Sequence, residues 1–216
     1  MKKLAFTAFA LSALCSSLAH AAPDNASYTL TGSVVEGACD IQINGMDAHT
    51  RNLAALDLSD LHPTTGITQI LGQPEKVTVA CASQRISPAI KISSTNQYTL
   101  NEHTTQTKIG TWVLGLGNAT SDKEPKVRLL STTAYNSDKT IWTAGSNGFL
   151  ELDEPGSITH VLIGKASSLD AATGQNFAFD LIPNFTLIGS DAIKAITNTG
   201  GMWGFSDTAQ FTLNYF

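Results

Sequence analysis

The sequence lacks the residue patterns typical of an enzyme active site. It has no Gly-x-Ser-x-Gly motif, the turn that presents a nucleophilic serine. Its histidines beyond the first 21 residues are scattered, so each is expected to be a surface or packing residue. These histidines are His49, His62, His103 and His160. The absences predict a protein that is not an enzyme, with no metal site and no cofactor.

Basic residues are also scarce. The chain has 13 Lys and Arg against 18 Asp and Glu, for a formal net charge of −5. This balance argues against a nucleic acid partner and against binding to anionic lipid surfaces.

The head of the chain has the features of a secretory signal peptide. Lys2 and Lys3 precede a mostly apolar stretch over residues 4–18, and Ala19-His20-Ala21 fits a signal peptidase site. We expect residues 1–21 to be removed by cleavage between Ala21 and Ala22. A lipoprotein signal at Cys15 is the alternative, although Leu14 stands where a small residue is expected. The remaining residues 22–216 contain no second long apolar run.

Cysteine is rare in the part that would remain. Only Cys39 and Cys81 lie beyond residue 21, and an even number of cysteines in an exported protein indicates a disulfide. Two free buried thiols are the alternative, which suits an oxidising compartment poorly. A zinc site is not expected, because no histidine lies at ligand spacing from the two cysteines.

What the sequence does contain is a succession of short alternating segments. Apolar and polar residues alternate with period 2, which predicts strands that bury one face. The strands are expected at 29–35, 39–44, 75–81, 89–93, 111–116, 127–131, 139–143, 149–152, 158–163, 176–182, 185–188 and 211–216. Asn147-Gly148 predicts a hairpin, residues 115–120 predict a turn, and Ser190 to Ile196 predicts one or two helical turns. The pattern favours a single all-β domain of the β-sandwich type.

The two ends of the chain suggest a role for these strands. Phe211 to Phe216 alternates and no further segment follows, so we expect an open sheet edge there. Tyr28, Leu30, Gly32 and Val34 share one side of an extended segment near the start. That segment is either an ordinary first strand in its own sheet or a strand offered to a neighbouring molecule. In the second case copies would join head to tail into a filament.

Three segments resemble subunits of bacterial fimbriae (pili) of the chaperone–usher pathway. The resemblance is carried by residues 30–39 (Leu-Thr-Gly-Ser-Val-Val-Glu-Gly-Ala-Cys), 77–81 (Val-Thr-Val-Ala-Cys) and 211–216 (Phe-Thr-Leu-Asn-Tyr-Phe). Pro74-Glu75-Lys76, before the second cysteine segment, resembles the corresponding residues of a longer branch of these pilin-like proteins. Together the segments cover about 60 residues at the two ends, and residues 94–193 do not align.

The resemblance implies a fold and an assembly mechanism. The domain at 36–216 would be an incomplete immunoglobulin-like β-sandwich that lacks its final strand, and residues 22–35 would be an N-terminal extension that donates a strand. The donor residues would be Tyr28, Leu30, Gly32 and Val34. The C-terminal strand, with Phe211, Leu213, Tyr215 and the carboxylate of Phe216, would bind a periplasmic chaperone.

The implied function is structural and serves cell adhesion. A periplasmic chaperone would lend its strand during folding, and an outer-membrane usher would exchange it for the extension of a neighbouring fimbrial subunit. The exported protein would reach the cell surface in a fimbrium. The alternative is a carbohydrate-binding adhesin or minor tip subunit that binds a host glycan, with Trp112, Trp142 and Trp203 as candidate contacts. A secreted β-sandwich enzyme ranks last.

Overall fold

The computed structural model describes most of the chain beyond the expected signal peptide. The described residues are 26–34, 39–52, 61, 68–94, 98–101, 106–135, 140–145, 150–152, 160–197 and 204–215. The expected signal peptide, its cleavage site at Ala21 and Ala22, and Phe216 lie outside them. For Gly32 and Val34 the backbone is described and the side chains are not.

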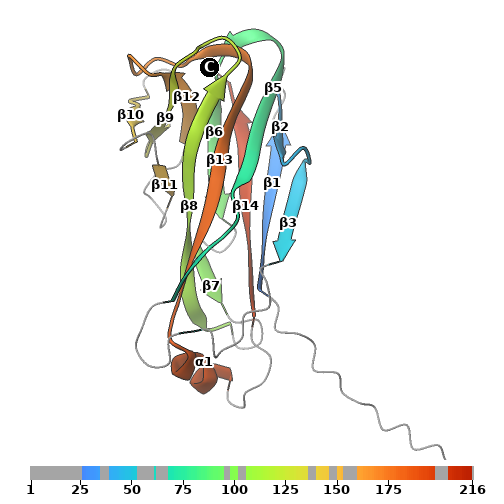
Figure 1. Ribbon diagram of the computed structural model, residues 1–216, viewed down its shortest axis with the longest axis vertical. Coiled ribbons are helices and arrows are strands. Elements are labelled where there is room, and N and C mark those ends of the chain that lie inside the picture. Colours follow the sequence, from blue (N-terminus) through green and yellow to red (C-terminus); the bar gives the residue numbers. More distant parts are fainter. Residues whose placement is uncertain are drawn as a thin grey trace, which may run out of the picture.

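The described residues form an all-β sandwich with one short helix, which confirms the predicted all-β sandwich architecture (Figure 1). The strands and the helix are β1 (Ala26–Val34), β2 (Cys39–Ile43), β3 (Ala48–Asn52), β4 (Thr68–Leu71), β5 (Glu75–Ile86), β6 (Ala89–Ser94), β7 (Thr99–Asn101), β8 (Lys108–Ser121), β9 (Val127–Thr132), β10 (Thr143–Ala144), β11 (Leu150–Leu152), β12 (His160–Lys165), β13 (Thr173–Leu187), α1 (Ser190–Thr197) and β14 (Phe205–Asn214). The helix lies where the sequence predicts it.

Two sheets contain these strands. The first sheet has the order β10-β9-β12-β6-β14-β1-β3. The second has the order β11-β8-β13-β5-β2, with β4 also paired to β13 and β7 to β8. Strands from both sheets contribute to one hydrophobic core, and strands such as β2, β5 and β14 turn alternate side chains inward. In β14, for example, Phe205, Ala209, Phe211 and Leu213 are all fully buried.

Some local predictions are wrong. The strands flanking Asn147-Gly148 do not pair with each other, because β10 pairs with β9 and β11 pairs with β8 in the other sheet. Residues 115–120 lie inside β8 instead of forming a turn. Asn118 has a positive φ of 51°, and the register with β13 shifts beside it, so the turn-favouring residues mark a β-bulge.

The segments expected at 176–182 and 185–188 form the single strand β13, which continues through Pro183. On one side of β13 the partner changes at this proline, since Leu181 pairs with Glu75 of β5 and Asn184 pairs with Leu71 of β4. A proline, which has no backbone N–H, is tolerated at such a gap between partners.

The largest correction concerns the terminal strand. β14 was expected to have an open edge, but it lies inside its sheet with β6 antiparallel on one side and β1 parallel on the other. The β1–β14 register runs from Ala26 beside Phe205 to Val34 beside Leu213. β3 then covers β1 and forms the edge of the sheet (Figure 1). In this structure the first strand therefore sits in its own sheet.

Candidate functional site: the groove occupied by β1

The segment expected to donate a strand fills a groove between β14 and β3. Tyr28 and Leu30 are fully buried, each with 0 % of its surface exposed, and both belong to the main hydrophobic core. Thr29 points to the opposite side, where its hydroxyl lies 3.0 Å from the hydroxyl of Thr50 in β3. We call the space taken by β1 between β14 and β3 the β1 groove.

Aromatic rings surround the Tyr28 side chain. Its ring centre lies 5.6 Å from that of Phe185 and 6.3 Å from that of Trp112, both on strands of the second sheet. Trp112 and Phe185 stack on each other at 5.7 Å with an interplanar angle of 6°. These offset and tilted arrangements are favourable for aromatic pairs. The ring of Tyr28 is thus held in a fixed aromatic pocket.

A buried carboxylate lies at the end of this pocket. The Tyr28 hydroxyl donates a hydrogen bond of 2.8 Å to Oε1 of Glu75, whose side chain is fully buried. Oε2 of Glu75 accepts a hydrogen bond from the Asn44 side-chain amide and lies 3.5 Å from Nε2 of His49. A carboxylate without hydrogen-bond donors would be costly to bury, so the donors Tyr28 and Asn44 make the site tolerable.

The same contacts connect the two sheets. Tyr28 and His49 belong to β1 and β3 of the first sheet, whereas Glu75 begins β5 of the second. Asn44 is fixed to β5 as well, since its Oδ1 accepts a hydrogen bond of 2.8 Å from the backbone N–H of Lys76. The polar end of the Tyr28 pocket is therefore built from β1, β3, the turn after β2, and β5.

A second buried acid lies beside Tyr28 in the register. Asp207 of β14, with 4 % of its surface exposed, accepts hydrogen bonds of 2.7 Å from Trp112 Nε1 and 2.5 Å from the Ser94 hydroxyl. Its other oxygen accepts a hydrogen bond of 2.7 Å from the backbone N–H of Thr208. Burial and the negative charge of Asp207 raise the pKa of the Tyr98 hydroxyl, which stays protonated.

The two cysteines form the expected disulfide, with an S–S distance of 2.07 Å between β2 and β5. Tyr215, directly after β14, contacts the same place. Its hydroxyl accepts a hydrogen bond of 3.3 Å from the Cys39 N–H and donates one of 3.2 Å to the Cys39 carbonyl. The guanidinium of Arg85 lies 5.0 Å from the ring centre of Tyr215, a cation–π contact. Hydrogen bonds from Tyr215 thus hold the end of the C-terminal strand beside the disulfide.

The structure brings two predicted groups of residues together. Tyr28 and Leu30, named as donor residues, lie in the same core as Phe211 and Leu213 of the C-terminal strand. Sequence reasoning missed the buried acids of this site. The signal was present, because Glu75 shares the inward phase of Val77 and Val79 in β5. Asp207 likewise shares the inward phase of β14.

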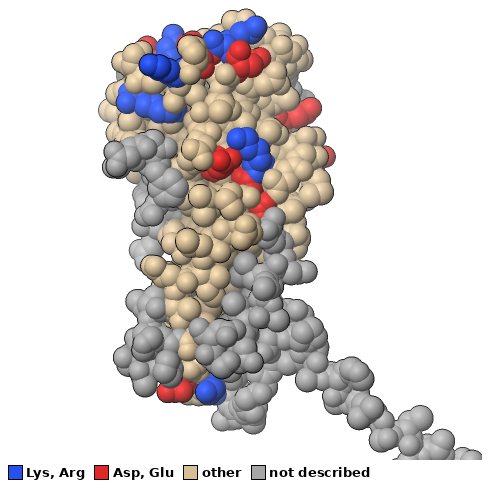
Figure 2. Space-filling model, viewed as in Figure 1, with Lys and Arg blue, Asp and Glu red and all other residues tan. Residues whose placement is uncertain are grey.

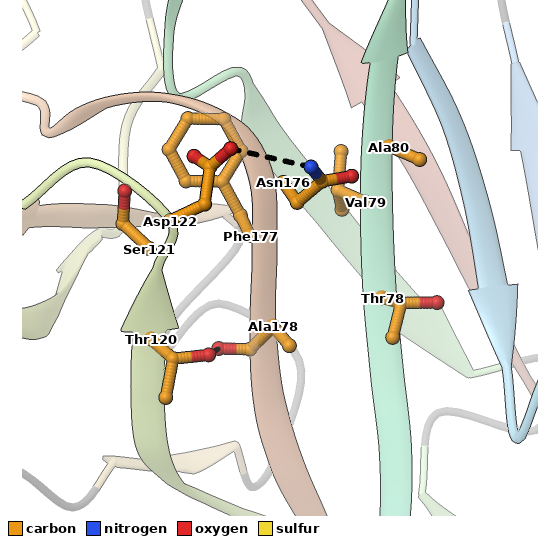
Figure 3. A pocket seen from close by; sticks show the side chains of 9 residues that line it. All are labelled: Thr78, Val79, Ala80, Thr120, Ser121, Asp122, Asn176, Phe177 and Ala178. Atoms are coloured by element: carbon orange, nitrogen blue, oxygen red, sulfur yellow. Dashed lines mark hydrogen bonds between the residues drawn. The ribbon is translucent and has the colours of Figure 1, made fainter.

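Two hollows on the surface of the described residues lie outside the β1 groove. One, of about 310 Å³, lies on the outside of the second sheet and is lined by β5, β8 and β13 (Figure 3). In it the Asp122 carboxylate accepts hydrogen bonds from the backbone N–H of Gln175 at 2.9 Å and from the side chain of Asn176 at 3.2 Å. These bonds lower the pKa of Asp122. The Asp122 carboxylate thus holds the start of β13 against the end of β8.

The second hollow, of about 490 Å³, is lined by Trp142, Leu169, Lys165 and Asp170 among others. Leu169 and Ile86 beside it are about half exposed, at 50 % and 48 %. Of the candidate tryptophans, Trp142 alone of those described reaches such a surface. Trp112 is only 1 % exposed, so it packs in the core, and Trp203 lies outside the described residues.

Charged side chains are unevenly distributed over the described part of the face in Figure 2. On the face shown in Figure 2, Lys, Arg, Asp and Glu gather mainly near the upper end of the sandwich, and both signs occur there. Within the described ranges, no group of His, Cys, Asp and Glu could hold a metal ion. No helix in the same ranges combines the length and the apolar character needed to cross a membrane.

Comparisons with known proteins add no further guide to function. No protein-family model matches the chain, and no similar sequence is found among curated proteins.

Proposed function

We propose that the chain is a structural subunit of a cell-surface fimbrium that polymerises by donor-strand exchange. In this proposal β1 leaves its own groove and enters the β1 groove of the next copy, after chaperone-assisted folding in the periplasm and with help from an outer-membrane usher. The domain without β1 is the incomplete immunoglobulin-like sandwich that the sequence resemblance implies. The structure then corresponds to a copy that fills its own groove.

The observation that carries the proposal is the position of β1. It is the first described strand, it lies parallel to β14, and it is enclosed by β14 and β3. Its two described inward side chains, Tyr28 and Leu30, are completely buried. Burying each is worth about 1.5–3 kcal/mol. This is a large part of the roughly 5–15 kcal/mol that stabilises a typical domain.

A groove of this kind favours replacement of its occupant over vacancy. An empty groove would expose core residues of β14 and leave the backbone groups of β14 and β3 unpaired along β1. A second copy offers the same nine-residue strand, so exchange restores every backbone pair. The contact is head to tail, which builds a filament when the rotation between copies does not close a ring.

The proposal is tested by expressing the full chain in a bacterial periplasm with and without a fimbrial chaperone. We expect the chaperone to raise the yield of soluble subunit, and its removal to give oligomer ladders that resist SDS until the sample is heated. A variant that lacks residues 22–31 should bind the chaperone but should not join the next copy. Polymerisation of that variant, or a chain that stays monomeric in every condition, would contradict the proposal.

A second candidate function is glycan binding at the fimbrial tip. The observation that favours it is the hollow lined by Trp142, Lys165 and Asp170, which offers a ring surface beside polar groups. Glycan-array binding by the full chain tests it. Loss of binding in Trp142→Ala with retention in Leu71→Ala, at a 70 % exposed side chain outside this hollow, would support it. Absence of binding to any glycan would exclude it.

A further inference from the structure

The geometry points to a groove that selects a tyrosine: the Tyr28 position of the β1 groove is a phenol-binding pocket whose occupant in an assembly is the Tyr28-Thr29-Leu30 segment of a second copy of this chain. The inference rests on the proposed exchange of β1 and adds what makes the incoming strand specific. An apolar groove would accept many alternating strands. A groove with a buried carboxylate at one position accepts far fewer.

The first step is the chemistry of the pocket. Its walls are the rings of Trp112 and Phe185, which contact the Tyr28 ring at 6.3 and 5.6 Å between centres. Its end is Oε1 of Glu75, which accepts the phenol hydrogen bond at 2.8 Å. A phenol satisfies both parts, because it has an apolar ring and one O–H at the far end. Phenylalanine offers only the ring, and leucine offers neither.

The second step is the cost of a wrong occupant. Glu75 has no exposed side-chain surface, so no solvent reaches the carboxylate to replace a lost donor. A hydrogen bond to a charged group contributes about 1.5–3 kcal/mol, which corresponds to a tenfold to hundredfold change in an equilibrium constant. Glu75 keeps its contacts with Asn44 and His49 whether tyrosine or phenylalanine occupies the pocket. The difference in binding between the two therefore measures the contribution of the Tyr28 hydroxyl.

The third step is register. Side chains alternate between faces along a strand, so a shift of one residue would place Thr29 or Ser27 at the carboxylate and Tyr28 on the outer face. Only one register sets the phenol at Glu75 and Leu30 in the core together. The polar pocket therefore selects both the identity and the alignment of the incoming strand.

The test uses the full chain and fluorescent nine-residue peptides with the sequence of residues 26–34. The peptides are the native one, Tyr28→Phe, and Thr29→Val as a matched control. Both changes remove one hydroxyl, but the Thr29 hydroxyl meets Thr50 on the outer face. We expect the full chain to capture the Tyr28→Phe peptide about tenfold to a hundredfold more weakly than the native peptide. Capture of the Thr29→Val peptide should change by no more than about fivefold.

The outcomes separate the two proposals. Capture of no peptide by the full chain would contradict strand exchange and with it the proposed function. Equal capture of the native and Tyr28→Phe peptides would overturn the selective pocket and leave strand exchange intact.

The unfolding equilibrium of the full chain tests the pocket independently of peptide capture. Tyr28→Phe should raise the unfolding constant about tenfold to a hundredfold, and by a smaller factor in a Glu75→Gln background, where the acceptor is neutral. Equal factors in the two backgrounds would also overturn the pocket.

Discussion

Truncating Leu30 should destabilise the folded chain strongly. This side chain is fully buried in the core from β1, at the register position beside Ala209 of β14. Leu→Ala at such a site removes transfer free energy and leaves a cavity, which together cost about 2–5 kcal/mol. In a domain of this size, each kcal/mol lowers the melting temperature by about 2–4 °C. Leu30→Ala is therefore expected to melt about 4–20 °C below the parent.

Equilibrium denaturation in urea and a thermal scan measure this directly. Thr29→Ala is the matched control, because it truncates the neighbouring residue on the outer face and removes only the contact with Thr50. That cross-strand contact is worth about 0.2–1 kcal/mol. If Leu30→Ala proved no more destabilising than Thr29→Ala, β1 would not fill the groove of the folded chain, and the reasoning on the β1 groove would fail.

Three further predictions concern the disulfide, a glycine and a histidine. Serine at both Cys39 and Cys81 removes a crosslink over a sequence separation of 42 residues. The chain-entropy model predicts that the unfolding free energy then falls by about 4 kcal/mol. An unchanged urea midpoint would refute this prediction. Alanine at Gly110 would place its Cβ 2.3 Å from the Thr186 carbonyl oxygen, so the unfolding free energy should fall by about 1–3 kcal/mol. An unfolding free energy equal to that of the parent would argue against the β8–β13 pairing. Burial and then Lys91 lower the pKa of His160 below 6.5, so the unfolded chain takes up this proton first. The unfolding free energy should fall as pH drops below about 6.5 and should become constant below the folded-state pKa of His160. Urea midpoints measured over a pH series test this, and the same fall in the His160→Asn variant would contradict it.

Much of the strand pattern could be read from the sequence. The period-2 alternation in β5 and β14 identifies which residues face inward, because burial of one face imposes that period. The disulfide was predicted from two cysteines in a chain expected to be exported, and the structure places Cys39 and Cys81 in register on neighbouring strands. These features are local or depend on a count, so a single sequence is enough to find them.

Strand partners could not be read in the same way. Alternation tells which face of a strand is buried but not which strand lies beside it. Asn147-Gly148, which lies outside the described residues, therefore led to a wrong pairing prediction, because β10 and β11 belong to different sheets. The parallel contact of β1 with β14 joins Ala26 to Phe205, near opposite ends of the chain, and no local pattern encodes it.

The candidate site could be predicted in part from the sequence. Tyr28 and Leu30 were identifiable as one face of a strand, and they are the buried face. The acid that receives the Tyr28 hydroxyl was visible only as a charged residue in an inward phase. Its partner lies 47 residues away, so the pairing of Tyr28 with Glu75 needed the three-dimensional arrangement.

A cysteine pair at positions 29 and 50 tests the central claim most directly. The hydroxyls of Thr29 in β1 and Thr50 in β3 lie 3.0 Å apart on the outer face, so Thr29→Cys with Thr50→Cys can form a disulfide across the strands. In an isolated copy the bond closes within one chain. In an assembly made by strand exchange it joins one chain to the next, and non-reducing gels of heated assemblies should show a covalent ladder that either single variant lacks. A bond that forms only within single chains under every assembly condition would contradict the exchange of β1 between copies.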